Sequence, residues 1–378
     1  MVIQSDACVG QVKVKIVFRA DASLQIGSGH VMRCLTLAEA LANEGHLCHF
    51  ICRALDGNLS SLIKDQGHEL TMLPAPYEQT EQSPTSQPDD YQQWLGVSWQ
   101  EDASQTLDRV VSSLTPEWLV VDHYGLDVRW EGEISSFVEK IMVIDDLANR
   151  SHKCNVLLDQ NLGRRYEDYD TLVPADCRRL IGPSFALLRP EFRMLRETSL
   201  ARRDASNIRQ ILISLGGVDR LNLTEEILKI LAEIPLPEET ALDVVMGTSA
   251  PHLDAVRHQA SMMPYAVTVS ASVNNMAERM QQADLSIGAA GGMSWERCCL
   301  GLPSIVVVLA ENQLKVAQAL RTAGAAAVVE NPRHLKTELP ILMNILGEAD
   351  NLKLLSERAS QLSYGDGCQN VINIINGS

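Results

Sequence analysis

The segment Ile26–Arg33 places two glycines and a histidine where a predicted strand meets a predicted helix. Gly27 and Gly29 let the backbone approach a ligand closely because they carry no Cβ atom, and the free N–H groups of the helix start favour an anion. His30 falls in the first helical turn, where a positive imidazolium is disfavoured. We therefore expect a neutral ring that can take a proton from water, although such a histidine can also simply cap its helix.

Carboxylates follow four predicted strands of the N-terminal half. A single aspartate after a strand is usually a cap or turn residue. Open parallel sheets, however, bind ligands beyond the carboxyl ends of their strands, so four such residues at one edge favour a polar sugar pocket. One carboxylate beside His30 would orient the imidazole and stabilise its protonated form, and the sequence does not rank the candidates. The predicted sugar-side residues are Asp21, Arg33, Asp122, Tyr124 and Asp145, with Asp159 ending the fourth strand.

Two glycine-rich turns in the C-terminal half are typical of phosphate-binding loops, in which backbone N–H groups hold a diphosphate. One predicted strand runs into Gly216–Gly217 and another into Gly288–Ser294, without the Gly-Lys-Ser/Thr of a P-loop. Glu296 in the next helix could take the two hydroxyls of a ribose, or simply complement the helix dipole. The predicted nucleotide-side residues are Gly216, Gly217, Gly291, Gly292, Met293, Ser294, Glu296, Asn312 and Gln313.

Strand-like and helix-like segments alternate along the chain, which predicts an α/β fold with parallel sheets. A polar stretch at Ser199–Asn207 separates two such series. We therefore expect two Rossmann-like domains, residues 12–200 for sugar binding and catalysis and residues 207–378 for nucleotide binding, with the site in a cleft between them. The predicted strands are Lys13–Phe18, Leu47–Cys52, His68–Leu73, Trp118–Val121, Lys140–Ile144, Val156–Leu158, Gln210–Ser214, Leu242–Met246, Ala266–Val269, Asp284–Ile287, Ser304–Val308 and Ala326–Val329.

The alternation stops between Pro74 and Trp99, in a stretch rich in Gln, Ser, Pro and Glu. Such a composition predicts an exposed insertion or a mobile lid. Trp94 and Trp99 close the segment, and we expect them to dock it against the domain rather than to clamp a ligand.

Composition argues against several classes of partner. The 378 residues carry a formal net charge of −16, which disfavours nucleic acid and anionic membrane surfaces. No apolar run reaches the ~18–20 residues of a membrane span, and no signal-peptide pattern is present. Nine scattered cysteines indicate a reducing compartment, so we expect a cytoplasmic monomer. His46, Cys48, His49 and Cys52 are metal-ligand types, but a strand turns alternate residues to opposite faces, so we expect neither a metal nor a cofactor.

Several long motifs resemble those of the UDP-sugar hydrolases of the pseudaminic acid pathway, from about Lys13 to the C-terminal region. The resemblance implies a GT-B fold similar to that of the peptidoglycan GlcNAc transferase. It also implies metal-free hydrolysis of UDP-2,4-diacetamido-2,4,6-trideoxy-β-L-altropyranose to UDP and the free sugar. The family's catalytic histidine falls on His30 and its nucleotide-binding turn on Gly291–Glu296. The motifs are Arg19–Ser23, Gly27–Cys34, Ile144–Ala148, Leu158–Asn161, Ser214–Asp219 and Gly291–Pro303.

Other functions remain open on the residues alone. A GT-B glycosyltransferase would use the same UDP-sugar site with an acceptor in place of water. A UDP-sugar epimerase would return a UDP-linked product, and a non-catalytic nucleotide-sugar sensor would need no neutral histidine at a helix start. The sequence also leaves open whether the glycosidic C–O or the P–O bond breaks, and the resemblance suggests C–O.

Overall fold

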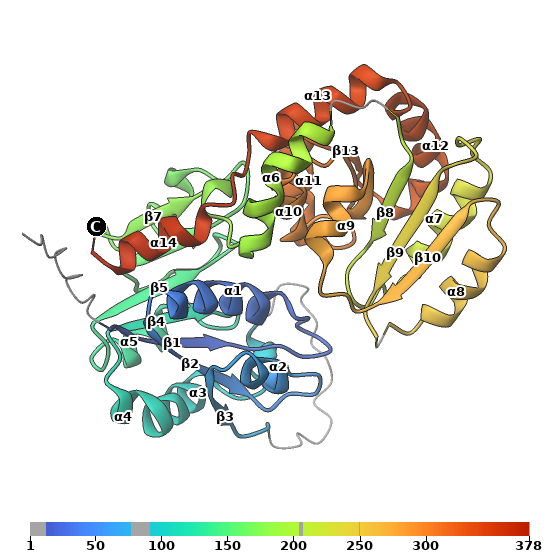
Figure 1. Cartoon of the computed structure of the whole chain (residues 1–378). Coiled ribbons are helices and arrows are strands. Elements are labelled where there is room, and N and C mark those ends of the chain that lie inside the picture. Colours follow the sequence, from blue (N-terminus) through green and yellow to red (C-terminus); the bar gives the residue numbers. More distant parts are fainter. Residues whose placement is uncertain (1–12, 77–90, 204–206, 249, 378) are drawn as a thin grey trace, which may run out of the picture. The chain divides into compact units, whose positions relative to one another are not determined.

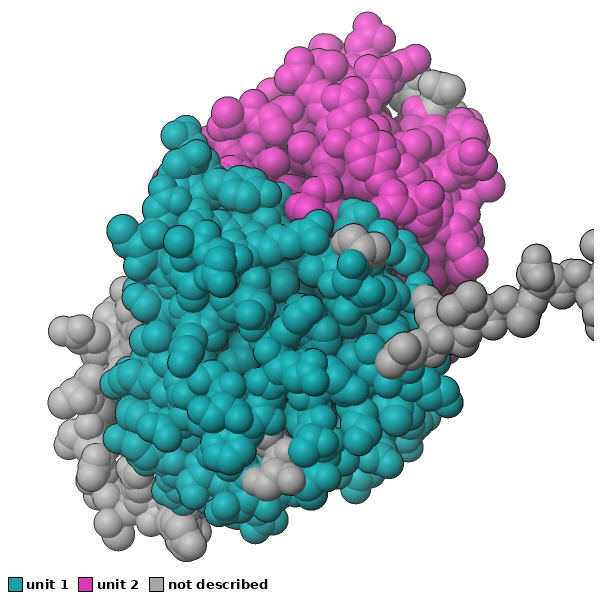
Figure 2. All heavy atoms as spheres, turned by 90° about the vertical axis from the view of Figure 1, so that its left-hand side faces the viewer, with its two compact units in different colours: residues 1–160, 164–181, 368–378 teal, residues 161–163, 182–367 magenta. Residues whose placement is uncertain are grey.

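A computed structural model describes residues 13–76, 91–203, 207–248 and 250–377 of the chain (Figure 1). The chain divides into two compact units (Figure 2). Unit 1 comprises residues 1–160, 164–181 and 368–378, and unit 2 comprises residues 161–163 and 182–367. Each unit is built on one sheet of parallel strands flanked by helices.

Unit 1 contains a seven-stranded parallel sheet in the order β3-β2-β1-β4-β5-β6-β7. Its central strands are almost entirely buried, as expected for parallel strands covered on both faces; all five residues of β4 are buried. The strands are β1 (Lys15–Ala20), β2 (Leu47–Arg53), β3 (Glu69–Leu73), β4 (Trp118–Asp122), β5 (Lys140–Ile144), β6 (Val156–Asp159) and β7 (Arg178–Ile181). The helices are α1 (Gly29–Asn43), α2 (Ser60–Asp65), η1 (Tyr91–Leu95), α3 (Trp99–Thr106), η2 (Leu107–Val111), α4 (Ser112–Leu114), α5 (Val128–Ile134), η3 (Tyr166–Tyr169) and α14 (Gly367–Ile375).

Unit 2 contains a six-stranded parallel sheet in the order β10-β9-β8-β11-β12-β13. Apolar residues of its strands and of the helices beside them form the core of the unit. The strands are β8 (Gln210–Ser214), β9 (Ala241–Met246), β10 (Ala266–Ala271), β11 (Leu285–Ala289), β12 (Ser304–Val307) and β13 (Ala327–Val329). The helices are η4 (Pro183–Phe185), α6 (Pro190–Arg202), α7 (Leu223–Ala232), α8 (Leu253–Ser261), α9 (Met276–Gln282), α10 (Met293–Cys299), α11 (Glu311–Thr322), η5 (Pro332–His334), α12 (Leu335–Leu346) and α13 (Ala349–Ser360).

All twelve predicted strands form, with bounds within two residues of the prediction. The strand that the sequence did not reveal is β7, a four-residue edge strand that pairs with β6 alone. It begins with two arginines, so it lacks the apolar run by which the inner strands are recognised.

The units divide between residues 181 and 182, ahead of the predicted linker at residues 199–207. Helix α6 belongs to unit 2 because its polar side chains bond to the backbone there. Arg196 donates to the carbonyl oxygens of Ser360 and Ser363, and the Ser199 hydroxyl donates to that of Leu300.

The chain returns to unit 1 at its C-terminal end. Gln369 and Asn376 of the α14 segment both donate to the carboxylate of Glu44, which follows α1. The side chains of Val371 and Ile372 are buried. Residues 368–378 therefore pack with unit 1, although the sequence assigned them to the second domain.

A buried charge network joins β1, β2 and α3 of unit 1. The Asp102 carboxylate accepts hydrogen bonds from Arg19 at 2.7 Å, from Arg53 at 2.6 Å and from the Trp130 indole at 3.0 Å. Arg19 also donates to Asp21 at 2.7 Å. Burial alone would raise the pKa of Asp102, but the two guanidinium groups lower it well below its usual range. Asp102 is therefore ionised, and every charge in the network has a partner.

Replacing Asp102 with alanine leaves two buried arginines short of a counter-ion. We expect Asp102→Ala to lower the free energy of unfolding of unit 1 by about 3–5 kcal/mol. Hydrogen exchange of the β1 and β4 amides measures that free energy separately from unit 2.

The matched control is Glu69→Ala. It removes an ion pair with His49, and the Glu69 side chain is 79% exposed. Its expected effect is within about 0.5 kcal/mol. Equal losses in the two variants would contradict a stabilising role of the buried network.

Candidate functional site

His30 is held by a tight turn between β1 and α1. The Gly27 N–H donates to the Ser23 carbonyl at 2.8 Å, and Gly27 has a φ of +82°, a conformation that glycine adopts without strain. Helix α1 begins at Gly29, so His30 lies in its first turn, as the sequence predicted. A Cβ at Gly29 would meet nothing within 4 Å, so no steric reason requires glycine there.

The Asp122 carboxylate, at the end of β4, joins His30 to Arg33. His30 Nδ1 lies 2.6 Å from Asp122 Oδ1. Arg33, one turn further along α1, donates to both oxygens of the same carboxylate, at 2.5 and 2.6 Å. Of the strand-end carboxylates that the sequence left unranked, Asp122 is therefore the one beside the histidine.

The charge of Asp122 fixes how the imidazole is used. Burial by itself would raise the pKa of Asp122, but Arg33 and His30 lower it well below its usual range. An ionised carboxylate can only accept hydrogen bonds, so His30 Nδ1 carries the proton of this bond and Nε2 is the atom left for further chemistry. The His30 side chain is 9% exposed, so solvent reaches the ring.

A second carboxylate and three aromatic rings complete this group. Asp146 accepts from Arg33 at 2.5 Å and from the Tyr124 hydroxyl at 2.9 Å. The Tyr124 ring lies edge-on to His30, with centroids 4.5 Å apart, and stacks on Trp94 at 5.6 Å. Tyr91 contacts both aromatic residues. One wall of the His30 site is thus aromatic.

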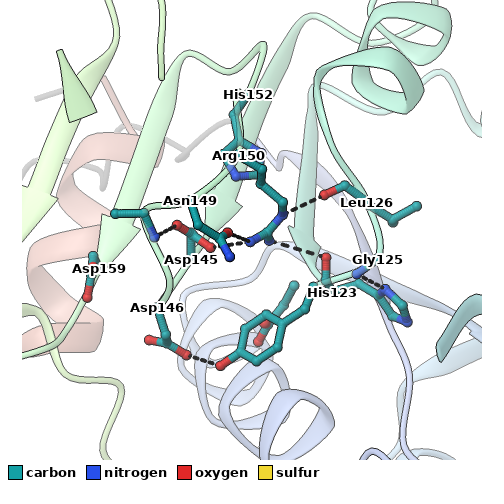
Figure 3. A network of polar contacts seen from close by, with 12 residues as sticks. His123, Gly125, Leu126, Asp145, Asp146, Asn149, Arg150, His152 and Asp159 are labelled. Carbon is teal, nitrogen blue, oxygen red and sulfur yellow. Dashed lines mark hydrogen bonds and ion pairs between the residues drawn. The ribbon is translucent and has the colours of Figure 1, made fainter. Parts of the chain in front are cut away.

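Asp21 and Asp145 lie in networks of their own. Asp21 pairs with Arg19 and accepts from the Arg53 backbone N–H at 2.6 Å. Asp145 accepts from Arg150 at 2.8 Å, and Arg150 also donates to the backbone carbonyls of His123 and Leu126, which follow β4 (Figure 3). Both carboxylates are fully buried. Their bonds support the strand ends, and a contact of Asp21 or Asp145 with the sugar stays a prediction.

His123 separates the His30 group from the Asp21 network. Its Nδ1 accepts a hydrogen bond from the Gly125 N–H at 3.0 Å, and Nε2 lies 3.4 Å from Asp21. Burial lowers the pKa of His123 to about 4, so this ring is neutral at physiological pH. Gly125 is required for close packing, because a Cβ there would lie 2.7 Å from the Tyr91 carbonyl.

The glycine-rich turns of unit 2 follow β8 and β11, as predicted. Gly216 has a φ of +99° and Gly291 a φ of +154°. Added Cβ atoms at Gly216, Gly217, Gly291 and Gly292 would meet nothing within 4 Å. The space beside these four backbone positions is open, which leaves room for a ligand.

The other nucleotide-side candidates lie in the helices that follow β11 and β12. Glu296 is in α10 and partly buried, and burial raises its pKa to about 7. Asn312 is exposed in the first turn of α11. Gln313 uses its amide oxygen to accept the Leu309 N–H at 3.0 Å. Ser294 is buried, and Met293 is partly buried.

The sequence reasoning missed Asp146 and underrated Trp94. Asp146 directly follows Asp145 after β5, and the pattern does not reveal which of two consecutive aspartates turns toward Arg33. Trp94 stacks on Tyr124, and the Trp99 ring lies against Arg129. Both contacts lie within unit 1, which agrees with the expectation that these tryptophans dock the segment against its domain. Most of the predicted insertion, residues 77–90, lies outside the described residues.

Two absences concern only the described parts of the chain. Within residues 13–76, 91–203, 207–248 and 250–377, no group of three or more His, Cys, Asp or Glu side chains is arranged to hold a metal ion. Among the helices of those same segments, none combines the length and apolar character that crossing a membrane requires.

The fold is of the GT-B class, with two Rossmann-like parallel sheets, as predicted. Residues 211–357 match the glycosyltransferase family 28 C-terminal domain. The crystal structure of MurG from Acinetobacter baumannii is similar with a TM-score of 0.69 at 16% sequence identity, covering 97% of this chain and all of that one. This likeness shows the fold.

Sequence relatives support the narrower resemblance. The UDP-2,4-diacetamido-2,4,6-trideoxy-beta-L-altropyranose hydrolase of Campylobacter jejuni is 27% identical over 312 residues, which are 82% of this chain and 97% of that protein. The spore coat polysaccharide biosynthesis protein SpsG of Bacillus subtilis is 32% identical over 154 residues, 41% of this chain and 44% of SpsG. The resemblance predicted from the motifs is thus confirmed.

The raised pKa of Glu296 predicts a pH-dependent loss of stability. Because the folded protein holds this proton more tightly than the unfolded chain, stability falls as pH rises from about 4.5 to about 7. We expect Glu296→Gln to abolish this loss, so that the Tm of the variant relative to the parent is higher at pH 8 than at pH 5. Thermal unfolding of the ligand-free proteins at both pH values measures the effect.

The control is Glu311→Gln, because the Glu311 side chain is exposed at the start of α11. Its Tm relative to the parent should be the same at the two pH values. An equally flat result for Glu296→Gln would show that burial does not penalise the charge of Glu296.

Proposed function

We propose that this protein hydrolyses UDP-2,4-diacetamido-2,4,6-trideoxy-β-L-altropyranose to UDP and the free sugar. The observation that carries the proposal is the hydrogen bond between His30 and the ionised Asp122 at the start of α1. This hydrogen bond leaves Nε2 of His30 to act as a general base, because the imidazole is accessible to solvent and the activation of water needs such a base. The substrate comes from the likeness to the Campylobacter jejuni enzyme.

In the proposed reaction, a water oxygen attacks the anomeric carbon as the glycosidic C–O bond breaks. The bonding electron pair leaves on the UDP oxygen, and His30 Nε2 takes a proton from the water. Asp122 stabilises the imidazolium that forms, and Arg33 keeps Asp122 in place through its two hydrogen bonds. An orienting carboxylate of this kind also holds the imidazole in the required tautomer.

Unit 2 is proposed to bind the UDP. Support comes from the match of residues 211–357 to the glycosyltransferase family 28 C-terminal domain and from the open space beside the turns at Gly216 and Gly291. Backbone N–H groups in such turns hold anions without a metal ion. Glu296 is proposed to accept hydrogen bonds from the ribose hydroxyls.

Replacing His30 with asparagine removes the proposed base and keeps a similar volume. We expect His30→Asn to lower kcat for UDP release by about 100-fold or more, with the Kd for UDP changed less than about twofold. A coupled assay for UDP and calorimetric titration measure the two quantities. His49→Asn is the control, at a histidine of β2 whose ring contacts Glu69 and Thr71. A full rate in His30→Asn would refute the assignment.

Replacing Asp122 with asparagine tests the orientation of the imidazole. We expect Asp122→Asn to lower kcat by about 100-fold or more, because the amide can donate to Nδ1 and so favour the wrong tautomer. Steady-state kinetics with circular dichroism as a check on folding measure this. Loss of activity only through a raised KM, with kcat kept, would contradict the proposed role.

Reaction in ¹⁸O-labelled water without any acceptor separates the candidate functions. Label in the free sugar indicates C–O cleavage by hydrolysis, whereas label in UDP indicates P–O cleavage. A glycosyltransferase would need an added acceptor for comparable turnover, and an epimerase would return a UDP-linked sugar. Binding without turnover would identify a nucleotide-sugar sensor.

A further inference from the structure

Unit 2 buries an arginine that lacks an acidic partner. Arg297 of α10 is 2% exposed. Its Nη2 donates to the Ala289 carbonyl at 2.8 Å and to the Ser294 hydroxyl at 3.1 Å. Its Nη1 has no hydrogen-bond partner, and no carboxylate lies within ion-pair distance of the guanidinium, among the residues that the structure describes.

The isolation of Arg297 contrasts with the buried arginines of unit 1. Arg19 and Arg53 share the carboxylate of Asp102. Burial lowers the pKa of Arg297 to about 10, so the guanidinium still carries its charge at neutral pH. The neighbouring Glu296 interacts with this charge without forming an ion pair. A buried charge without a direct counter-ion is costly, and an anion bound close by would relieve that cost.

The guanidinium lies where the two strands with glycine-rich turns end. A Cβ at Gly288 would lie 2.3 Å from Arg297 Nη1 and 2.8 Å from the Ser214 carbonyl. Gly288 pairs with Ser214 across β11 and β8, and each strand then enters its turn. Glycine at position 288 therefore leaves the space that the guanidinium occupies.

We infer that Arg297 is a positioning residue of the nucleotide site, and that its uncompensated charge selects the diphosphate of UDP over an uncharged nucleoside. Arg297 holds the turn after β11 through its hydrogen bonds to Ala289 and Ser294. Its guanidinium also places a positive charge close to the backbone of that turn. This inference rests on the proposed binding of UDP by unit 2, and it concerns binding alone.

A matched arginine in the same unit separates charge at the site from structural support. Arg203 is also largely buried, and burial lowers its pKa to about 10. It donates to the carbonyl oxygens of Met280 and Ala283. These residues precede β11, so Arg203 supports the opposite end of the strand from Arg297.

The test is calorimetric titration of UDP and of uridine into the full-length parent and three variants. We expect Arg297→Gln, which removes one positive charge beneath the turn, to weaken UDP binding about tenfold, equivalent to about 1.4 kcal/mol, and to change uridine binding less than about twofold. We define the ratio as the Kd for uridine divided by the Kd for UDP. Arg297→Lys, which keeps the charge, and Arg203→Gln should both keep the ratio of the parent protein.

A purely structural role would not change that ratio. An unchanged ratio in Arg297→Gln, or an equal fall in Arg203→Gln, overturns the inference. Gly288→Ala is a second variant, and it leaves every charge in the chain. Its Cβ must displace Arg297 Nη1 and also crowds the Ser214 carbonyl, so its ratio should fall as well. A parent ratio in Gly288→Ala also overturns the inference. Failure of the parent protein to bind UDP would instead refute the proposed function.

Discussion

The ionised carboxylate of Asp122 is the constraint on which the candidate site of unit 1 depends. It is fully buried, and it remains charged because Arg33 donates to both of its oxygens. The same charge requires His30 Nδ1 to donate and leaves Nε2 for chemistry. Two side chains one turn apart on α1 are thereby tied to the end of β4, so that the sheet, rather than the turn alone, sets the position of the imidazole.

The candidate sites of the two units differ in how they treat buried charge. In unit 1, the strand ends carry carboxylates that each have an arginine, as for Asp122 with Arg33 and Asp145 with Arg150. In unit 2, Arg297 lacks such a partner among the described residues, and the pKa of Glu296 is raised by burial. A polar network with all charges paired is suited to holding groups still, whereas an unpaired charge is suited to attracting a ligand of opposite sign.

The sequence predicted elements well and side-chain partners poorly. Apolar runs and glycine-rich turns are local signals, so the strands and the place of His30 followed from the pattern. Which carboxylate contacts His30 depends on strand order, because Asp122 is 92 residues away in the chain and arrives through pairing of β4 with β1. The division between the compact units lies ahead of the predicted linker for a similar reason: the polar face of α6 resembles a linker until its bonds to unit 2 are known.

The position of Arg33 is in turn fixed by two neighbouring strands. Its guanidinium bonds to Asp122 at the end of β4 and to Asp146, which follows β5, and these two strands pair in parallel. The Tyr124 hydroxyl also donates to Asp146, so the aromatic wall beside His30 is anchored to the same carboxylate. The geometry of the candidate site therefore depends on the order of the strands in the sheet, because a guanidinium shared by two carboxylates can be held only where both strand ends lie side by side.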